Sequence, residues 1–309
     1  MHKIPAGVGI CLVLAWYAQA EENLFWKQWG DGQAEVAAYD LVIPRDNELR
    51  RGVAVSIFVT ESFSNTLRVK ADPGKHPAPN PGNGIVPVMK LNLMKDFHTG
   101  IYNYHDMLSA FGALAPANGL PAGVLTKAVY SRQEWLGATF NMALLDKSRV
   151  KITSHSYLDG GGDQQRELAM QPNAMTEDGL WFWVRGWAQP VLGPGDVKAM
   201  PYLTSAEPGK GMLQWTNVQL KRAPLTKKIT VDGQTLDADL YTAQVMNGVR
   251  KDFYVERGGQ RRILRWDFST GERGQLIKSA RLKYWELNGK GGEVALRQLG
   301  LLPRSPRTM

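Results

Sequence analysis

The chain has a single cysteine, Cys11, among its 309 residues. It lies in an N-terminal apolar run that we expect to be removed, so the mature chain has no means of forming a disulfide, a thiolate metal site or a cysteine nucleophile. Histidine is also scarce, with five in the chain, which leaves little material for histidine-based catalysis. Such a chain must be held together by its core, which is feasible because a protein near 300 residues buries roughly three quarters of its unfolded surface.

Catalytic motifs are missing as well. The sequence contains no G-x-S-x-G elbow, no H-E-x-x-H pair, no Walker loop and no G-x-G-x-x-G after a strand. The glycines of "LDGGGDQQ" (158–165) favour a turn, since no strong helical pattern follows them. We therefore assign no catalytic residue, no metal ligand and no cofactor, and predict a protein that is not an enzyme. A catalytic pair of carboxylates stays open, because a sequence does not show which acids meet.

The N-terminus, "MHKIPAGVGICLVLAWYAQAEE", has the three parts of a secretory signal peptide. Lys3 gives a positive start, residues 7–17 are apolar, and Ala18-Gln19-Ala20 is an A-x-A cleavage site. The apolar run is shorter than the roughly 20 residues of a membrane-spanning helix, and no later segment is apolar enough to cross a membrane. We expect cleavage after residue 20 and an exported protein, either periplasmic or extracellular.

Positive charge is in moderate excess, with a formal net charge of +8. Lys and Arg cluster in four short stretches along the C-terminal half, but no stretch has the pattern of a recognition helix. We therefore expect no nucleic-acid partner. A solvated basic face, or contact with an anionic envelope surface, accounts for the excess.

Short alternating segments between Gly, Pro, Asn and Asp predict an antiparallel β protein. In "VPVMKLNLM" (86–94), Met89, Leu91 and Leu93 share one face of the predicted strand. Asp232-Gly233 and Gly258-Gly259 fit tight hairpin turns. The Pro-rich and Gly-rich stretch 71–84 predicts an exposed loop.

The middle of the chain, 172–196, breaks this rhythm and favours a short helix near 174–188. Glu177 and Asp178 suit a first turn, and the Pro and Gly residues from Pro190 onward would stop it. Gly179 and Gly186 count against a helix, so a strand stays the alternative.

His98 and His105 stand in the stretch richest in polar groups, "LNLMKDFHTGIYNYHDM" (91–107). Two metal ligands on one helix are a turn apart and on one strand two residues apart, whereas these are seven apart. We expect a hairpin with its turn at residues 97–100 and both imidazoles accessible to solvent.

Tryptophan residues are more informative about a possible binding site than the histidines, and the chain has ten of them. Trp rings serve cores, pockets and interfaces alike, so ordinary packing is the first interpretation. The sharper hypothesis is that Trp181, Trp183 and Trp187 line a pocket for an apolar ligand, with Arg185 placed for an acidic head group. Three further aromatic residues are predicted as ligand contacts, namely Tyr102, Tyr104 and Trp135.

Four C-terminal segments carry a further pattern: "LWFWVR" (180–185), "YVE" (254–256), "ILRW" (263–266) and "KYW" (283–285). Together, over about 175–286, they resemble a poorly characterised group of exported bacterial proteins. These proteins look like relatives of periplasmic lipoprotein carriers, and the resemblance implies a curved antiparallel sheet with a helix on its concave face. It implies no defined activity.

The sequence thus predicts a mainly β protein with a large curved antiparallel sheet, or an open or half barrel, and a short helix near 174–188 on the concave face. The expected organisation is a signal peptide at 1–20, one domain at 21–289 and a loosely ordered tail at 290–309. The domain would consist of two strand blocks, about 21–165 and 197–289. The first functional hypothesis is non-enzymatic binding or carriage of a lipid-like ligand in the cell envelope. An envelope-assembly or scaffold protein with a protein partner, and a carboxylate-based hydrolase, are the alternatives.

Overall fold

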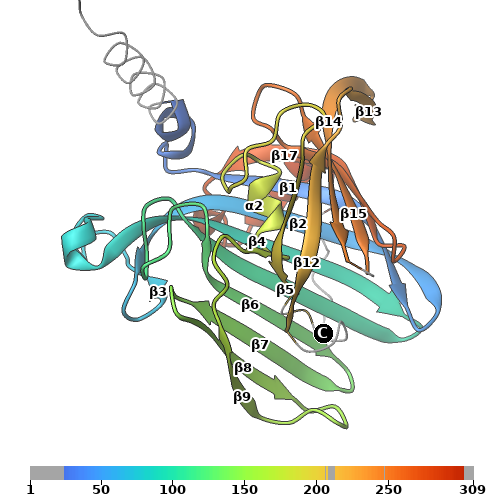
Figure 1. The fold of residues 1–309 in the computed structure, drawn as a ribbon. Coiled ribbons are helices and arrows are strands. Elements are labelled where there is room, and N and C mark those ends of the chain that lie inside the picture. The colour runs from blue at the N-terminus through green and yellow to red at the C-terminus, as the bar shows by residue number, and fades with distance from the viewer. Residues whose placement is uncertain (1–23, 206, 208–212, 247, 303–309) are drawn as a thin grey trace, which may run out of the picture.

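The computed structural model describes residues 24–205, 207, 213–246 and 248–302. The predicted signal peptide lies outside the described residues. Within them the chain forms one sheet of seventeen strands, a single turn of α-helix and three short 3-10 helices. Figure 1 shows the sheet as a wide, bent surface, which confirms the predicted fold class.

The first strand block precedes the helix. It contains β1 (Ala34–Arg45), β2 (Glu48–Ser64), β3 (Val69–Lys70), β4 (Ile85–Thr99), β5 (Tyr102–Ala113), β6 (Leu125–Glu134), β7 (Gly137–Leu145), β8 (Arg149–Ser156) and β9 (Gln164–Ala169).

The second strand block follows β9. It contains β10 (Met175–Thr176), β11 (Val197–Leu203), β12 (Trp215–Arg222), β13 (Lys227–Val231), β14 (Gln234–Val245), β15 (Arg250–Glu256), β16 (Ile263–Phe268) and β17 (Arg273–Leu282). The helical elements are η1 (Pro81–Asn83), α2 (Leu180–Trp183), η2 (Tyr284–Glu286) and η3 (Gly292–Leu299).

Neighbouring strands run in the order β9-β8-β7-β6-β5-β4-β2-β1-β17-β16-β15-β14-β12-β11-β10. All these pairs are antiparallel except β10–β11. The short strands β3 and β13 pair with β2 and β14. The two strand blocks therefore join through β1 and β17, which brings the C-terminal strand beside the N-terminal one.

Burial alternates along the strands as the sequence predicts. On β4, the side chains of Met89, Leu91 and Leu93 are buried in the main core, and Val150 and Ile152 on β8 are buried there too. A period of two makes one face of each strand apolar, and the curvature of the sheet gathers these faces into one interior.

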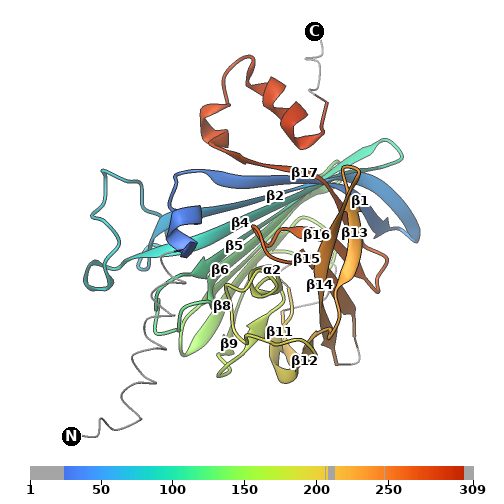
Figure 2. The same ribbon diagram turned by 90° about the horizontal axis from the view of Figure 1, so that it is seen from above.

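The helix α2 lies inside the curve, as Figure 2 shows. Trp181 packs edge-on against Phe253 and Trp266, with ring centroids 5.2 Å from each, and Trp183 packs against Tyr241 at 5.3 Å. All four residues of the helix are buried. Its aromatic face thus fills the interior of the bent sheet.

The helix is shorter than the 174–188 segment predicted for it. Met175 and Thr176 pair with β11 and so cannot belong to a helix. Gly186 adopts a left-handed φ of 83°, a conformation that ends a helix. Arg261 then donates to the carbonyl oxygens of Val184 and Arg185, each at 3.1 Å, and satisfies groups that the truncated helix leaves free.

The tail contains more structure than the sequence predicted. Residues 292–299 form η3, and Leu299 is buried on the convex face of the sheet beside residues of β1 and β2. A 3-10 turn has neither of the periodicities used to read the sequence, so the pattern gave no signal there. Within the loop 71–84, residues 73–80, 82 and 83 are exposed, as predicted.

Strand β9, at one edge of the sheet, comes close to the start of β12 without pairing with it. Trp215 on β12 donates its indole N–H to the carbonyl of Ala169 at the end of β9, at 2.9 Å. Arg166 on β9 donates to the carbonyl of Leu213 at 3.0 Å. Two side-chain bonds therefore connect β9 with the opposite side of the sheet, without a ladder of backbone bonds that would close a barrel, and the sheet stays open.

Strand direction defines two ends of the molecule. The turns β1–β2, β4–β5, β6–β7 and β8–β9 all lie at one end, which we call the hairpin end. The connections 65–84, 114–124 and 184–196 lie at the other, which we call the loop end.

Candidate binding sites

Trp181 and Trp183, the two predicted pocket residues on α2, are core residues. Both are nearly inaccessible to solvent, and Trp183 donates its indole N–H to the carbonyl of Pro190 at 2.9 Å. Trp181 lines a hollow of about 30 Å³, which is too small for a lipid-like ligand. Their predicted role in binding stays a prediction.

Arg185 has an acidic partner within the chain. Its guanidinium donates to both carboxylate oxygens of Glu35 on β1, at 2.6 and 3.0 Å, and to the carbonyl of Gln260 at 3.0 Å. It also lies 4.8 Å from the ring centroid of Phe58 and 4.5 Å from that of Trp187. The predicted head-group contact is thus a buried ion pair that ties α2 to β1.

The other predicted residues fall into two places. Trp187 lies at the loop end, with ring centroids 5.1 Å from Trp29 and 5.3 Å from Phe58. Tyr102 and Trp135 lie at the hairpin end, 5.7 Å apart. Tyr104 is buried there and stacks on Phe97 at 4.8 Å. The seven predicted residues therefore do not form one site.

The histidine-rich stretch forms the β4–β5 hairpin. His105 lies opposite Asp96, and its Nδ1 is 2.7 Å from the Asp96 carboxylate. His98 lies opposite Asn103, and both histidines are exposed. Among the described residues no group of three or more His, Cys, Asp and Glu side chains is arranged to hold a metal ion.

An apolar groove opens at the loop end, and we call it the loop-end groove. It consists of two hollows, of about 310 and 300 Å³, that share Ala122, Gly123, Ala188 and Gln189. Its walls are mostly apolar and come from both strand blocks and the segments around α2. They include Phe25, Trp26, Ala113, Leu114, Trp187 in the first hollow and Pro121, Val124, Leu125, Ala174, Met175, Pro190, Lys198 and Met200 in the second.

The close approach of two loops shapes this groove. Gly123 has a φ of 84°, and a Cβ atom there would lie 2.9 Å from the carbonyl oxygen of Trp187. Only glycine allows both this backbone conformation and this contact. Residues 121–124 can therefore lie directly against residues 187–190, with the two hollows on either side of the contact.

Lys198 is the cation at the rim of the groove. It lies on β11 and, like Met200 on the same strand, lines the second hollow. Its side chain is exposed to solvent. It forms no ion pair with any residue that the structure describes. An unpaired ammonium at the mouth of an apolar groove suits a ligand with an apolar body and an anionic end.

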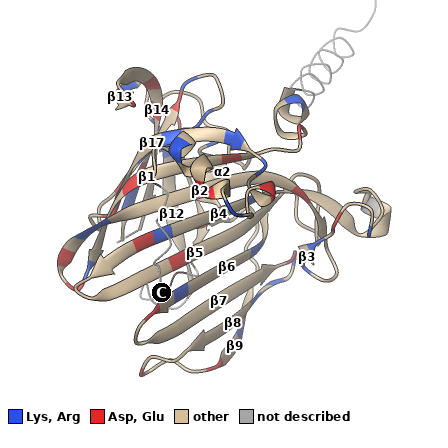
Figure 3. Cartoon of the chain, turned by 180° about the vertical axis from the view of Figure 1, so that it is seen from behind, with Lys and Arg blue, Asp and Glu red and all other residues tan. Residues whose placement is uncertain are grey.

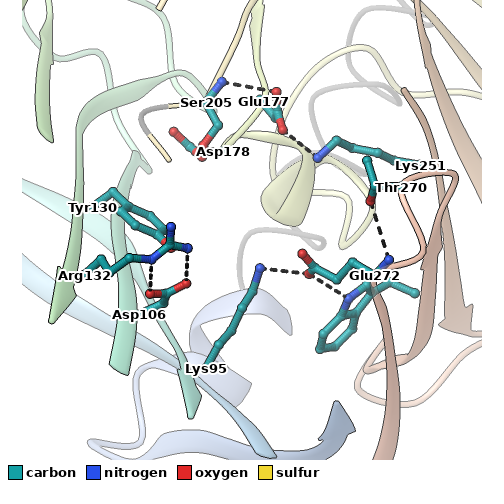
Figure 4. Close-up of polar contacts among 11 residues, drawn as sticks. Lys95, Asp106, Tyr130, Arg132, Glu177, Asp178, Ser205, Lys251, Thr270 and Glu272 are labelled. Atoms are coloured by element: carbon teal, nitrogen blue, oxygen red, sulfur yellow. Dashed lines mark hydrogen bonds and ion pairs between the residues drawn. The ribbon is translucent and has the colours of Figure 1, made fainter. Parts of the chain in front are cut away.

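Charged side chains gather inside the sheet toward the hairpin end (Figure 4). Lys95, Asp106 and Arg132 lie directly opposite one another on β4, β5 and β6. Arg132 binds both oxygens of Asp106, at 2.7 and 2.6 Å. From the other half of the sheet, Glu272 lies 2.8 Å from Lys95.

The segments that flank α2 complete this interior cluster. Glu177 accepts from Lys251 at 2.5 Å and from the backbone N–H of Ser205 at 3.1 Å, and Asp178 accepts from the Ser205 hydroxyl at 2.7 Å. Opposite charges thus lie in contact across the interior, which is how buried charges are tolerated.

Burial dominates the acid–base behaviour of the cluster. It raises the pKa of Tyr130 well above its usual value, and that of Tyr202 too, where the charges of Glu177 and Asp178 add to the effect. Burial lowers the pKa of Arg132, but its hydrogen bonds to Asp106 and the negative charges of Asp106 and Glu207 together outweigh this and hold that pKa above the usual value. Both phenols are neutral and the guanidinium is charged at any physiological pH.

The cavity in this cluster is about 30 Å³, which is room for about one or two water molecules. Acids do converge there, as the hydrolase alternative requires, but the space does not admit a substrate. We therefore regard the cluster as a structural network that joins the two halves of the sheet.

Sequence reasoning missed the cluster although a signal was present. Lys95 is in phase with Leu91 and Leu93, and Arg132 is in phase with Tyr130, so both point to the buried face. Charged residues on the apolar face of three successive strands indicate an interior ion-pair network.

One solved structure has a fold similar to that of this chain. The fold is similar to the crystal structure of a β-barrel-like protein of the domain of unknown function DUF1849 from Brucella abortus, with a TM-score of 0.43 and 10% sequence identity over 81% of this chain and 98% of that chain. No family model matches the sequence, and no curated protein matches it. The predicted relation to lipoprotein carriers stays a prediction.

Proposed function

We propose that the protein is a non-enzymatic binding protein for an apolar, chain-like ligand with an anionic end. The observation that supports this most is the loop-end groove, whose two hollows have the size of small-molecule sites, about 300–1,000 Å³. An apolar chain laid past Ala122 and Ala188 would exchange water for apolar walls, and its anionic end would meet Lys198 at the rim.

The loop-end groove replaces the helix–sheet interface as the proposed location of the ligand. The interior around α2 is filled by its own aromatic side chains. The groove uses Trp187 but not Trp181 or Trp183. The ligand would therefore bind beside the core rather than within it.

The N-terminal sequence supports a proposal on location. A signal peptide at 1–20 would deliver the mature chain to the periplasm or the exterior, where a carrier of lipid-like molecules has its ligands. No helix among the described residues is long and apolar enough to span a membrane.

A titration with fluorescent probes tests the binding proposal. Ala122 is exposed and lines both hollows, so Ala122→Trp fills the groove without entering the core. We expect the mature protein to bind cis-parinaric acid, with dodecanoate as a competitor, and Ala122→Trp to weaken binding by about tenfold or more, since a filled pocket loses most of its buried apolar contact.

Ala138→Trp is the matched control for this experiment. Ala138 is exposed on β7 at the hairpin end and lines neither hollow, so this variant should bind as the wild type does. Equal affinities in all three proteins, or no binding by the wild type, would rule the groove out as the site.

A second candidate function is docking of a protein partner at the hairpin end. Its turns expose large apolar side chains, including Ile101, Trp135, Leu136, Tyr157 and Leu158, and such a row on adjacent turns is typical of interaction surfaces. This scaffold function predicts that the double variant Trp135→Ser, Tyr157→Ser loses partner binding but keeps its affinity for cis-parinaric acid.

A further inference from the structure

A second groove, which we call the convex-face groove, lies on the outer side of the sheet. Its volume is about 420 Å³. Its walls come from six parts of the chain: the segment before β1, the strands β2, β3 and β4, the Pro-rich loop and η2. It shares only Trp26 with the loop-end groove, so it is a separate site from the proposed apolar one.

Flat apolar rings dominate two sides of this groove. Trp26 and Trp285 line it and are 36% and 43% exposed, which is unusual for side chains of this size. Pro73, Pro79 and Pro87 add further ring surfaces. Half-exposed Trp rings offer flat faces on which a ring-shaped ligand with an apolar C–H face can stack.

The floor of the groove carries a carboxylate with spare hydrogen-bonding capacity. Glu61 Oε1 lies 3.3 Å from Lys90 Nζ, whereas its Oε2 is buried and has no hydrogen-bond partner among the described residues. A buried acceptor without a donor is costly. The terminal torsion of Glu is soft, so a small rotation turns Oε2 toward a donor in the groove.

Other polar groups on the floor are also suited to hydroxyl groups. Thr60 donates its hydroxyl proton to the carbonyl of Trp29 at 2.6 Å and so presents only its acceptor side. Gln33 lines the groove with an amide that both donates and accepts. Acceptors and an amide beside aromatic faces match a ligand with hydroxyl groups at its edge.

Charge narrows the class of ligand further. Lys90 pairs with Glu61 at 3.3 Å and Lys70 pairs with Asp72 at 3.1 Å. The charges beside the groove are therefore already compensated, and a charged ligand would have to compete with these pairs. A neutral ligand avoids this competition.

We propose that the convex-face groove binds a neutral saccharide, whose ring stacks on Trp285 and Trp26 while a hydroxyl donates to Glu61. Saccharide rings combine the apolar C–H face and the hydroxyl edge that the two sides of the groove require. This site is independent of the chain-like ligand proposed above.

Calorimetric titration of the full-length mature protein tests this with three soluble probes: maltotetraose, cellotetraose and chitotetraose. We expect at least one to bind, and Trp285→Ala to weaken that binding by about fivefold to tenfold, because one stacking surface is lost. Trp135→Ala is the control: this Trp is also exposed but lies at the hairpin end, and the variant should bind unchanged.

A second variant keeps the test decisive if Trp285→Ala alters the fold. Glu61→Gln preserves size but replaces one acceptor by a donor, so saccharide affinity should fall several-fold. Saturation-transfer NMR on the wild type should show the C–H protons of the bound sugar in contact with aromatic rings. Absence of binding by all three probes, affinity unchanged in both variants, or binding of a proline-rich peptide instead would overturn the proposal.

Discussion

Arg185 is a buried side chain that connects three separate parts of the fold. It contacts β1 through Glu35, the β15–β16 turn through Gln260, and the rings of Phe58 and Trp187. Its pairing explains how an arginine two residues after α2 can be buried: the charge is neutralised within the fold. The positive charge that faces the loop-end groove comes from Lys198.

Removing the partner of Arg185 should be costly. In Glu35→Ala the guanidinium stays buried without its carboxylate, and breaking such a pair costs about 3–5 kcal/mol of unfolding free energy. Asp237→Ala is the control, because the Asp237–Lys228 pair at 2.7 Å is largely exposed and should contribute only about 0–1 kcal/mol. Guanidinium chloride unfolding measures both; similar losses in the two variants would contradict the account.

Lys198 should contribute to affinity only when the ligand carries a negative charge. Lys198→Gln removes an exposed cation, so affinity for dodecanoate should fall about twofold to fivefold, the range of an exposed ion pair. Affinity for dodecanol, measured by competition with the same fluorescent probe, should not change. An equal loss for both ligands would mean that Lys198 acts by packing.

Among the elements, the β16–β17 pair is the most closely packed against an aromatic ring. Gly274 on β17 lies opposite Trp266 on β16, and a Cβ atom at Gly274 would lie 2.1 Å from the indole ring. No side chain other than hydrogen fits there, so this glycine lets Trp266 lie flat on the neighbouring strand.

Gly274→Ala should therefore destabilise the protein by about 1–3 kcal/mol or more, as overpacking does. Gly289→Ala is the matched control, since a Cβ atom there meets nothing within 4 Å. Thermal unfolding followed by near-UV circular dichroism, which reports the Trp environment, would show the difference. A Gly274→Ala protein as stable as the control would mean that the indole has room to move.

Periodicity predicted the strands and the curved sheet because each strand carries its own alternating pattern, as on β4 with Met89, Leu91 and Leu93. The helix was located but overextended, since its end depends on the backbone conformation of Gly186. The loop-end groove could not be predicted, because Gly123 and Trp187 are distant in sequence and meet only through tertiary packing. The interior ion pairs were readable in part from strand phase, as Lys95 shows.

At the scale of the whole molecule, the open sheet is the defining feature. Among the described residues, the edge strand β9 is joined to the start of β12 and the residues before it by the side-chain bonds of Trp215 and Arg166. Lys and Arg are interspersed with Asp and Glu along the strands, as Figure 3 shows. The sheet is bent by its filled interior rather than by closure.

Trp215→Phe should weaken the connection between β9 and β12 without unfolding the core. It removes the 2.9 Å bond to Ala169 while keeping most of the ring, at a cost of about 0.5–1.5 kcal/mol. Hydrogen exchange of the β9 amides should become faster and that of β4 should not. Trp135→Phe, at an exposed position that forms no such bond, is the control; unchanged exchange in β9 would show that the bond does not hold the edge.

Photo-crosslinking tests the central claim most directly. A dodecanoate analogue with a diazirine near its methyl end would be bound, irradiated and mapped by mass spectrometry on the digested protein. The account predicts labelling of residues 121–125 and 187–190, suppressed by excess dodecanoate and by Ala122→Trp. Labelling confined to the hairpin end, or labelling that excess dodecanoate does not suppress, would contradict it.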